Sequence, residues 1–147
     1  MRFFLILIIT FTFFLNSKAK SFETYIVYKV NNEIITNVDI DIEYRYLIAL
    51  NKNLKKLSKK RIIQLAKESI LREKIKKTEI EKFFDLSQEN KFIDRIIKNF
   101  YVRLGIENEN DFKLYLLNYN LSFNDVKKKI TIEAAWNDLV YKKYSRQ

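Results

Sequence analysis

The sequence has no proline, no cysteine and no histidine, and its only glycine is Gly105. Because proline and glycine make most tight turns, their scarcity argues against a sheet-rich fold and favours long helices joined by short polar loops. Without cysteine or histidine there can be no disulfide, no thiol nucleophile, no catalytic imidazole and no zinc site built from these ligands. We therefore expect no cofactor, no metal and no enzymatic activity.

What the sequence does contain is enough apolar material for one core. Apolar residues make up 48% of its 147 residues, and 12 phenylalanines with 9 tyrosines supply bulky side chains. A chain of this length forms one domain rather than two. The net charge of +10 suits an anionic partner, although part of the lysine excess is also what an AT-rich coding sequence produces.

The first nineteen residues have the pattern of a secretory signal peptide. A positive start at Arg2 is followed by the uncharged run Phe3–Leu15, and Ser17 and Ala19 give the small-x-small pattern of a cleavage site. We expect cleavage after Ala19, which leaves residues 20–147 as a periplasmic domain. The alternative is an uncleaved membrane anchor, although a spanning helix needs about 20 apolar residues and this run is shorter.

The start of the expected domain predicts a small β-hairpin. Two apolar runs, at residues 25–30 and 33–36, flank an Asn31-Asn32 pair, and asparagine tolerates the backbone angles of a tight hairpin turn. Thr36 and Asp39 then have the Thr-x-x-Asp spacing of a capping box, which predicts the start of a helix.

Helical periodicity and capping residues fill the rest of the chain, apart from a lysine-rich segment at 52–60 that is typical of a solvated loop. Gly105 follows an amphipathic stripe at the position where a left-handed residue ends a helix. Ser122 and Asp125 repeat the Ser-x-x-Asp start. The expected helices run from Thr36 to about Asn51, from Ser58 towards Phe84, from Ser87 to Gly105, from residues 108–111 to Tyr119, and from Phe123 to about Tyr144. The predicted fold is mainly α, with a small N-terminal hairpin followed by about five helices around one core.

This order of elements resembles the N-terminal domain of the SurA-type periplasmic chaperones. The family opens with a strand, a short turn around Asn-Asn, a second apolar stretch and a Thr/Ser-x-x-Asp helix start. The matching residues here are Val30, Asn31, Asn32, Ile35, Thr36, Asp39 and Ile40. Later segments at 62–68, 112–116 and 121–130 are similar to the helices of that domain, so the resemblance covers residues 24–144.

The resemblance implies a chaperone domain that holds unfolded outer-membrane polypeptides in transit through the periplasm. Family members usually continue into parvulin-type prolyl isomerase domains and a returning C-terminal segment. Neither is present in these 147 residues, and histidine, which is common in parvulin active sites, is absent. Isomerase activity is therefore not carried over to this chain.

Aromatic side chains are the candidate polypeptide-binding groups, because their rings tolerate partial exposure on adaptable apolar surfaces. The alternative for each of them is a place in the core, as is usual for aromatics at helical spacing. Phe83 and Phe84 are the best exceptions, because adjacent helical residues point about 100° apart and cannot both enter one core. The full set of candidates is Phe83, Phe84, Tyr101, Tyr115, Tyr119, Trp136, Tyr141 and Tyr144.

The expected partners are unfolded or outer-membrane polypeptides, which the basic surface would also attract where they are acidic. Nucleic acid is not an expected partner, since the signal-peptide pattern predicts export and the sequence contains no zinc finger, RNP motif or glycine-rich phosphate loop. Contact with a membrane is expected only if the apolar run is retained. Two alternatives remain open: a membrane-anchored scaffold, and a subunit that completes its core in a homo- or hetero-oligomer.

Overall fold

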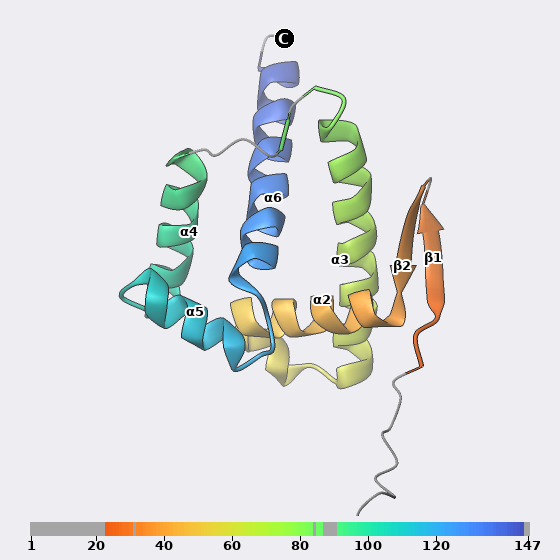
Figure 1. Ribbon diagram of the computed structural model, residues 1–147, viewed down its shortest axis with the longest axis vertical. Coiled ribbons are helices and arrows are strands. Elements are labelled where there is room, and N and C mark those ends of the chain that lie inside the picture. Colours follow the sequence, from red (N-terminus) through yellow and green to blue (C-terminus); the bar gives the residue numbers. More distant parts are fainter. Residues whose placement is uncertain (1–22, 31, 84, 87–90, 146–147) are drawn as a thin grey trace, which may run out of the picture.

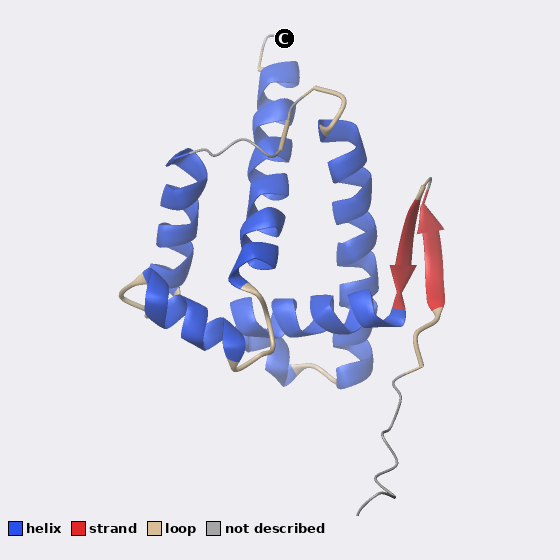
Figure 2. Cartoon of the chain, in the orientation of Figure 1, coloured by secondary structure: helices blue, strands red, loops and turns tan. Residues whose placement is uncertain are grey.

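The computed structural model describes residues 23–30, 32–83, 85–86 and 91–145. The described chain is mainly helical, with a two-stranded hairpin followed by five α-helices (Figures 1 and 2), which confirms the predicted fold class. The predicted signal peptide at residues 1–19 lies outside the described residues.

Strands β1 (Ile26–Val30) and β2 (Glu33–Thr36) form an antiparallel pair, as the two apolar runs predict. Tyr28 lies opposite Ile35, and the register is irregular between the first strand residue and Tyr28. Ile35 is completely buried beneath the hairpin, whereas its partner Tyr28 is exposed. Asn31, the first residue of the predicted turn, lies outside the described residues.

The helices follow the predicted order with two differences: residues 52–56 form a short 3₁₀-helix instead of an open loop, and α3 ends at Ile80 before the Phe83-Phe84 pair. The start predicted at Ser87 lies outside the described residues. The bounds are α2 Asn37–Leu50, η1 Lys52–Lys56, α3 Lys59–Ile80, α4 Lys91–Arg103, α5 Glu109–Leu117 and α6 Phe123–Tyr144.

Side-chain caps fix most of the helix starts, because the first turn of a helix has N–H groups without a partner in the helix. Thr36 accepts a hydrogen bond from the Asp39 N–H at 3.2 Å, and Asp39 accepts one from the Thr36 N–H at 2.7 Å, so the predicted capping box is confirmed. Ser58 caps α3, and Asn108 caps α5. Ser122 precedes α6 as predicted, but its side chain makes no capping bond.

Two left-handed residues end the middle helices. Gly105 has φ 79° and Asn120 has φ 50°, in the region that glycine and asparagine enter most readily. After α4 the N–H of Ile106 donates to the carbonyl of Tyr101 at 3.0 Å, and after α5 the N–H of Leu121 donates to Leu116 in the same way. Both bonds have the six-to-one pattern of a Schellman motif. Gly105 therefore has the role that the sequence predicts.

The helices α4, α6 and α3 stand side by side, and α2 crosses α3 near one end and extends towards the start of α6 (Figure 1). Buried residues form two clusters on either side of this crossing. The larger cluster joins α4, α5, α6 and the end of α2, and consists of Ala49, Ile93, Ile97, Tyr101, Phe112, Leu116, Leu121, Val126 and Ile130. The smaller cluster seals the hairpin onto α2 and α3, and consists of Ile35, Ile40, Ala66 and Ile70.

Candidate functional site

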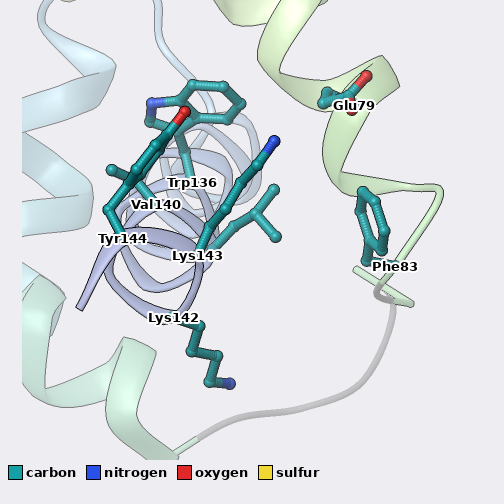
Figure 3. Close-up of a pocket in the computed structure, with 8 residues that line it drawn as sticks. Glu79, Phe83, Trp136, Val140, Lys142, Lys143 and Tyr144 are labelled. Carbon is teal, nitrogen blue, oxygen red and sulfur yellow. The ribbon is translucent and has the colours of Figure 1, made fainter. Parts of the chain in front are cut away.

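An apolar cleft of about 440 Å³ opens between the C-terminal ends of α3 and α6 (Figure 3). It brings together three of the predicted binding residues, Phe83, Trp136 and Tyr144. Phe83 is 63% exposed and Tyr144 is 59% exposed, so both rings are available to a ligand. The remaining lining residues are Glu79, Leu139, Val140, Lys142 and Lys143.

The α6 wall of the cleft follows from helical periodicity. Residues 136, 139, 140, 143 and 144 are spaced at i, i+3, i+4, i+7 and i+8, and such residues share one face of a helix. This stripe continues past the level at which α2 crosses, so nothing from the two core clusters covers it (Figure 1). The spacing was available in the sequence, and it identifies Leu139 and Val140 as cleft residues that the prediction did not include.

The α3 wall ends in a turn. Phe83 lies after the helix and donates its N–H to the carbonyl of Ile80 at 2.9 Å. The argument from adjacent helical directions therefore does not apply to the Phe83-Phe84 pair, because the helix has already ended. Phe83 is exposed because this turn points its ring at the cleft from the side opposite α6 (Figure 3). Phe84 lies outside the described residues.

The cleft has charges at its edge and apolar carbon inside. The Lys76 ammonium lies 5.9 Å from the centre of the Trp136 ring and 2.6 Å from the Glu133 carboxylate, which fixes the half-buried indole between α3 and α6. Lys142 pairs with Asp138 at 2.7 Å on the outer side of α6. Such a surface suits a ligand held by apolar contact, with charged groups at the rim to orient it.

Tyr141 and Tyr101, two further predicted binding residues, have opposite environments. Tyr141 is 71% exposed on α6 beside the cleft. Tyr101 is only 7% exposed, and its ring centre lies 5.7 Å from that of Phe112 inside the larger core cluster. Its predicted role in surface binding is therefore wrong, because the stripe that contains it is the one that α4 buries against α5 and α6.

Tyr115 and Tyr119 come together at the other end of the molecule and not in the cleft. The Tyr115 hydroxyl donates to the carbonyl of Ala49 at 2.6 Å and lies 3.5 Å from the Tyr119 hydroxyl, to which Lys55 donates at 3.1 Å. Burial raises the pKa of Tyr115, whereas hydrogen bonding with Tyr115 and Lys55 lowers the pKa of Tyr119. These contacts fasten α5 to the end of α2, which is a structural role.

A buried ionic cluster joins α2, α3 and α6 between the two apolar clusters. Lys129 of α6 lies 2.8 Å from a carboxylate oxygen of Glu43 and forms a hydrogen bond with Glu73. Glu43 is 1% exposed and Lys129 is 9% exposed. Burial raises the pKa of Glu73 against the pull of Lys129, and two carboxylates facing one ammonium leave an excess of negative charge. The charges of Glu43 and Glu73 outweigh burial and raise the pKa of Lys129.

The three residues of this ionic cluster are not among those that line the cleft. Among the described residues, no group of three or more acidic side chains is arranged to hold a metal ion. Within the same part of the chain, no helix has both the length and the apolarity to cross a bilayer. Comparisons with protein-family models, with curated proteins and with solved structures each found no match.

Proposed function

We propose that this protein is a periplasmic chaperone-type domain that binds unfolded or outer-membrane polypeptides during folding and transit, with no chemistry of its own. One observation carries the proposal: an open apolar cleft lined by aromatic rings, at a place where the core does not need them. Phe83 and Tyr144 project at its two sides, and Trp136 forms part of its floor.

The dimensions of the cleft favour side chains over a folded partner. A volume of about 440 Å³ is near the lower end for small-ligand pockets and has room for a few side chains of an extended segment. Aromatic anchors contribute large contact area at low conformational cost, which suits a ligand without a fixed shape. The resemblance to the SurA-type N-terminal domain and the signal-peptide pattern support the same reading from the sequence.

Suppression of aggregation tests the proposal. An unfolded outer-membrane barrel protein is diluted from denaturant with and without the full chain, and light scattering is followed. We expect suppression near equal molar ratio. A folded, monomeric protein that leaves the scattering unchanged would rule out the chaperone function and favour the scaffold alternatives, of which a dedicated-partner subunit would show a concentration-dependent melting temperature.

A matched pair of variants ties the effect to the cleft. Phe83→Ser removes a ring that is 63% exposed, and Leu114→Ser removes an equally exposed apolar side chain, 61%, from α5. Each substitution changes stability by less than about 0.5 kcal/mol, because neither side chain is in the core. We expect Phe83→Ser to weaken client binding by about tenfold, as for the loss of one aromatic anchor, and Leu114→Ser to have no effect. Equal losses in the two variants would contradict binding at the cleft.

A further inference from the structure

The end of the molecule opposite the cleft carries a dense group of positive charge. Six of the ten residues from Lys52 to Arg61 are basic and none is acidic. They belong to η1 and the first turn of α3, and all are exposed. None of the six forms an ion pair with another residue that the structure describes. We define this basic end as Lys52, Lys55, Lys56, Lys59, Lys60 and Arg61.

The position of these charges is unfavourable for the fold. Lys59, Lys60 and Arg61 occupy the first turn of α3, where the helix dipole is positive and acidic residues are the usual choice. Several lysines elsewhere in the molecule have acidic partners, as where Lys74 and Lys77 both bind Glu33. Repulsion at the basic end is relieved most directly by an anionic partner.

A further observation points to the surface of a membrane. Leu57 lies between the cations of η1 and those of α3 and is 43% exposed. The cationic surface therefore includes an apolar side chain that can enter the interfacial layer of a bilayer.

We propose that the basic end docks on a membrane surface rich in anionic phospholipid headgroups, with Leu57 inserted between them. The chemistry is the attraction of clustered ammonium groups to headgroup phosphates, which is strongest at low salt. A nucleic acid would also attract the cations, but it has no apolar layer into which the exposed leucine could insert. The inference does not depend on the proposed chaperone function, because it concerns the opposite end of the molecule.

Vesicle flotation with the full chain tests this docking. Vesicles of phosphatidylcholine alone are compared with vesicles of equal parts phosphatidylcholine and phosphatidylglycerol, at low and at high salt. The apolar run can bind both kinds of vesicle, so the quantity of interest is the additional binding that phosphatidylglycerol causes. We expect phosphatidylglycerol to increase binding clearly at low salt, and we expect high salt to remove this increase. No gain, or a gain that salt leaves intact, would overturn the proposal.

Charge-matched variants show which lysines cause the additional binding to phosphatidylglycerol. Lys56→Gln/Lys59→Gln/Lys60→Gln removes three charges from the basic end, and Lys29→Gln/Lys98→Gln/Lys128→Gln removes three exposed charges elsewhere. At about fivefold per lysine near an anionic surface, we expect the first variant to lose about a hundredfold of the phosphatidylglycerol-dependent partition coefficient. The second should lose far less, and an equal loss would show that net charge alone drives the binding. If inorganic phosphate or a short DNA duplex binds the basic end as strongly as the vesicles do, and so displaces the protein from them, this result would also contradict docking on lipid.

Discussion

At the scale of single residues, Lys129 has the most demanding position. It is the shared partner of two carboxylates, those of Glu43 and Glu73, where three helices meet, and its ammonium lies 5.3 Å from the centre of the Tyr46 ring. Burial of such a cluster adds little stability by itself, because the cost of removing the charges from water offsets their attraction. Loss of one partner is different, since it leaves the others buried and unpaired. Burial and the nearby Glu43 and Glu73 charges already raise the pKa of Tyr46.

We predict that Lys129→Met lowers the free energy of unfolding by about 3–5 kcal/mol, the usual cost of breaking a buried ion pair. This is a large part of the stability of a single domain. Urea denaturation followed by circular dichroism measures the effect. Lys128→Met, at the neighbouring exposed position, is the control and should change stability by less than about 0.5 kcal/mol. Similar losses in both variants would show that Lys129 is not a buried counter-ion.

Single residues also show the limit of prediction from the sequence. The aromatic pattern identified Phe83, Trp136 and Tyr144, but it gave no means of separating the helical residues Trp136 and Tyr144 from Tyr101, which also belongs to a helical stripe and lies in the core. Burial depends on which helix covers a stripe, and that is a property of the assembled molecule. The partners of Lys129 were not predicted for the same reason, because 56 residues separate it from Glu73 along the chain.

At the scale of elements, one carboxylate holds the hairpin on α3. Glu33 begins β2 and binds Lys74 at 2.9 Å and Lys77 at 2.9 Å, one helical turn apart on α3. These two lysine hydrogen bonds lower the pKa of Glu33 from 4.5 to about 2. Because the folded state holds the ionised form more strongly than the unfolded state does, the contribution of Glu33 to stability is present above pH 4.5. It is lost as the pH falls from 4.5 to about 2.

We therefore predict that Glu33→Gln lowers the free energy of unfolding by about 1 kcal/mol at neutral pH, a value reduced from the pKa shift because the pair is partly solvated. The difference from the wild type should vanish as the pH approaches 2. Urea denaturation across this pH range measures it. Glu81→Gln removes a carboxylate that Lys77 contacts within the same helix region, at 3.7 Å, and should have little effect. A difference that stays constant with pH would contradict the role of Glu33 as an ionised clamp.

The elements themselves were predicted well where their ends are determined locally. The capping box at Thr36, the cap at Ser58 and the left-handed Gly105 each act within four residues, so they can be read from the sequence. The end of α3 could not be read in this way. No proline or glycine interrupts the charged, periodic sequence from Ser58 to Phe84, and yet the helix stops at Ile80, which is completely buried.

At the scale of the whole molecule, α3 separates two surfaces of different character. Its 22 residues span about 33 Å at 1.5 Å per residue, with the basic end at its start and the cleft at its end. This distance exceeds the screening length of about 8–10 Å at physiological salt several times over. Substitutions at the two ends share no contacts, so their effects should be independent. A protein docked through its basic end would present the cleft away from the membrane surface.

We predict that the protein can hold a client on a vesicle, with both ends occupied at once. A labelled unfolded barrel protein is mixed with the full chain and with vesicles of equal parts phosphatidylcholine and phosphatidylglycerol, and the vesicles are floated. The client should float beyond its background level only when both ends are intact. Phe83→Ser should leave the protein on the vesicles and lower the amount of floated client about tenfold, as truncation of one anchor implies. In the variant Lys56→Gln/Lys59→Gln/Lys60→Gln, neither the protein nor the client should float with the vesicles. This variant should still suppress aggregation in solution. If client binding instead releases the wild-type protein from the vesicles, the two ends compete, and the separation along α3 does not make them independent.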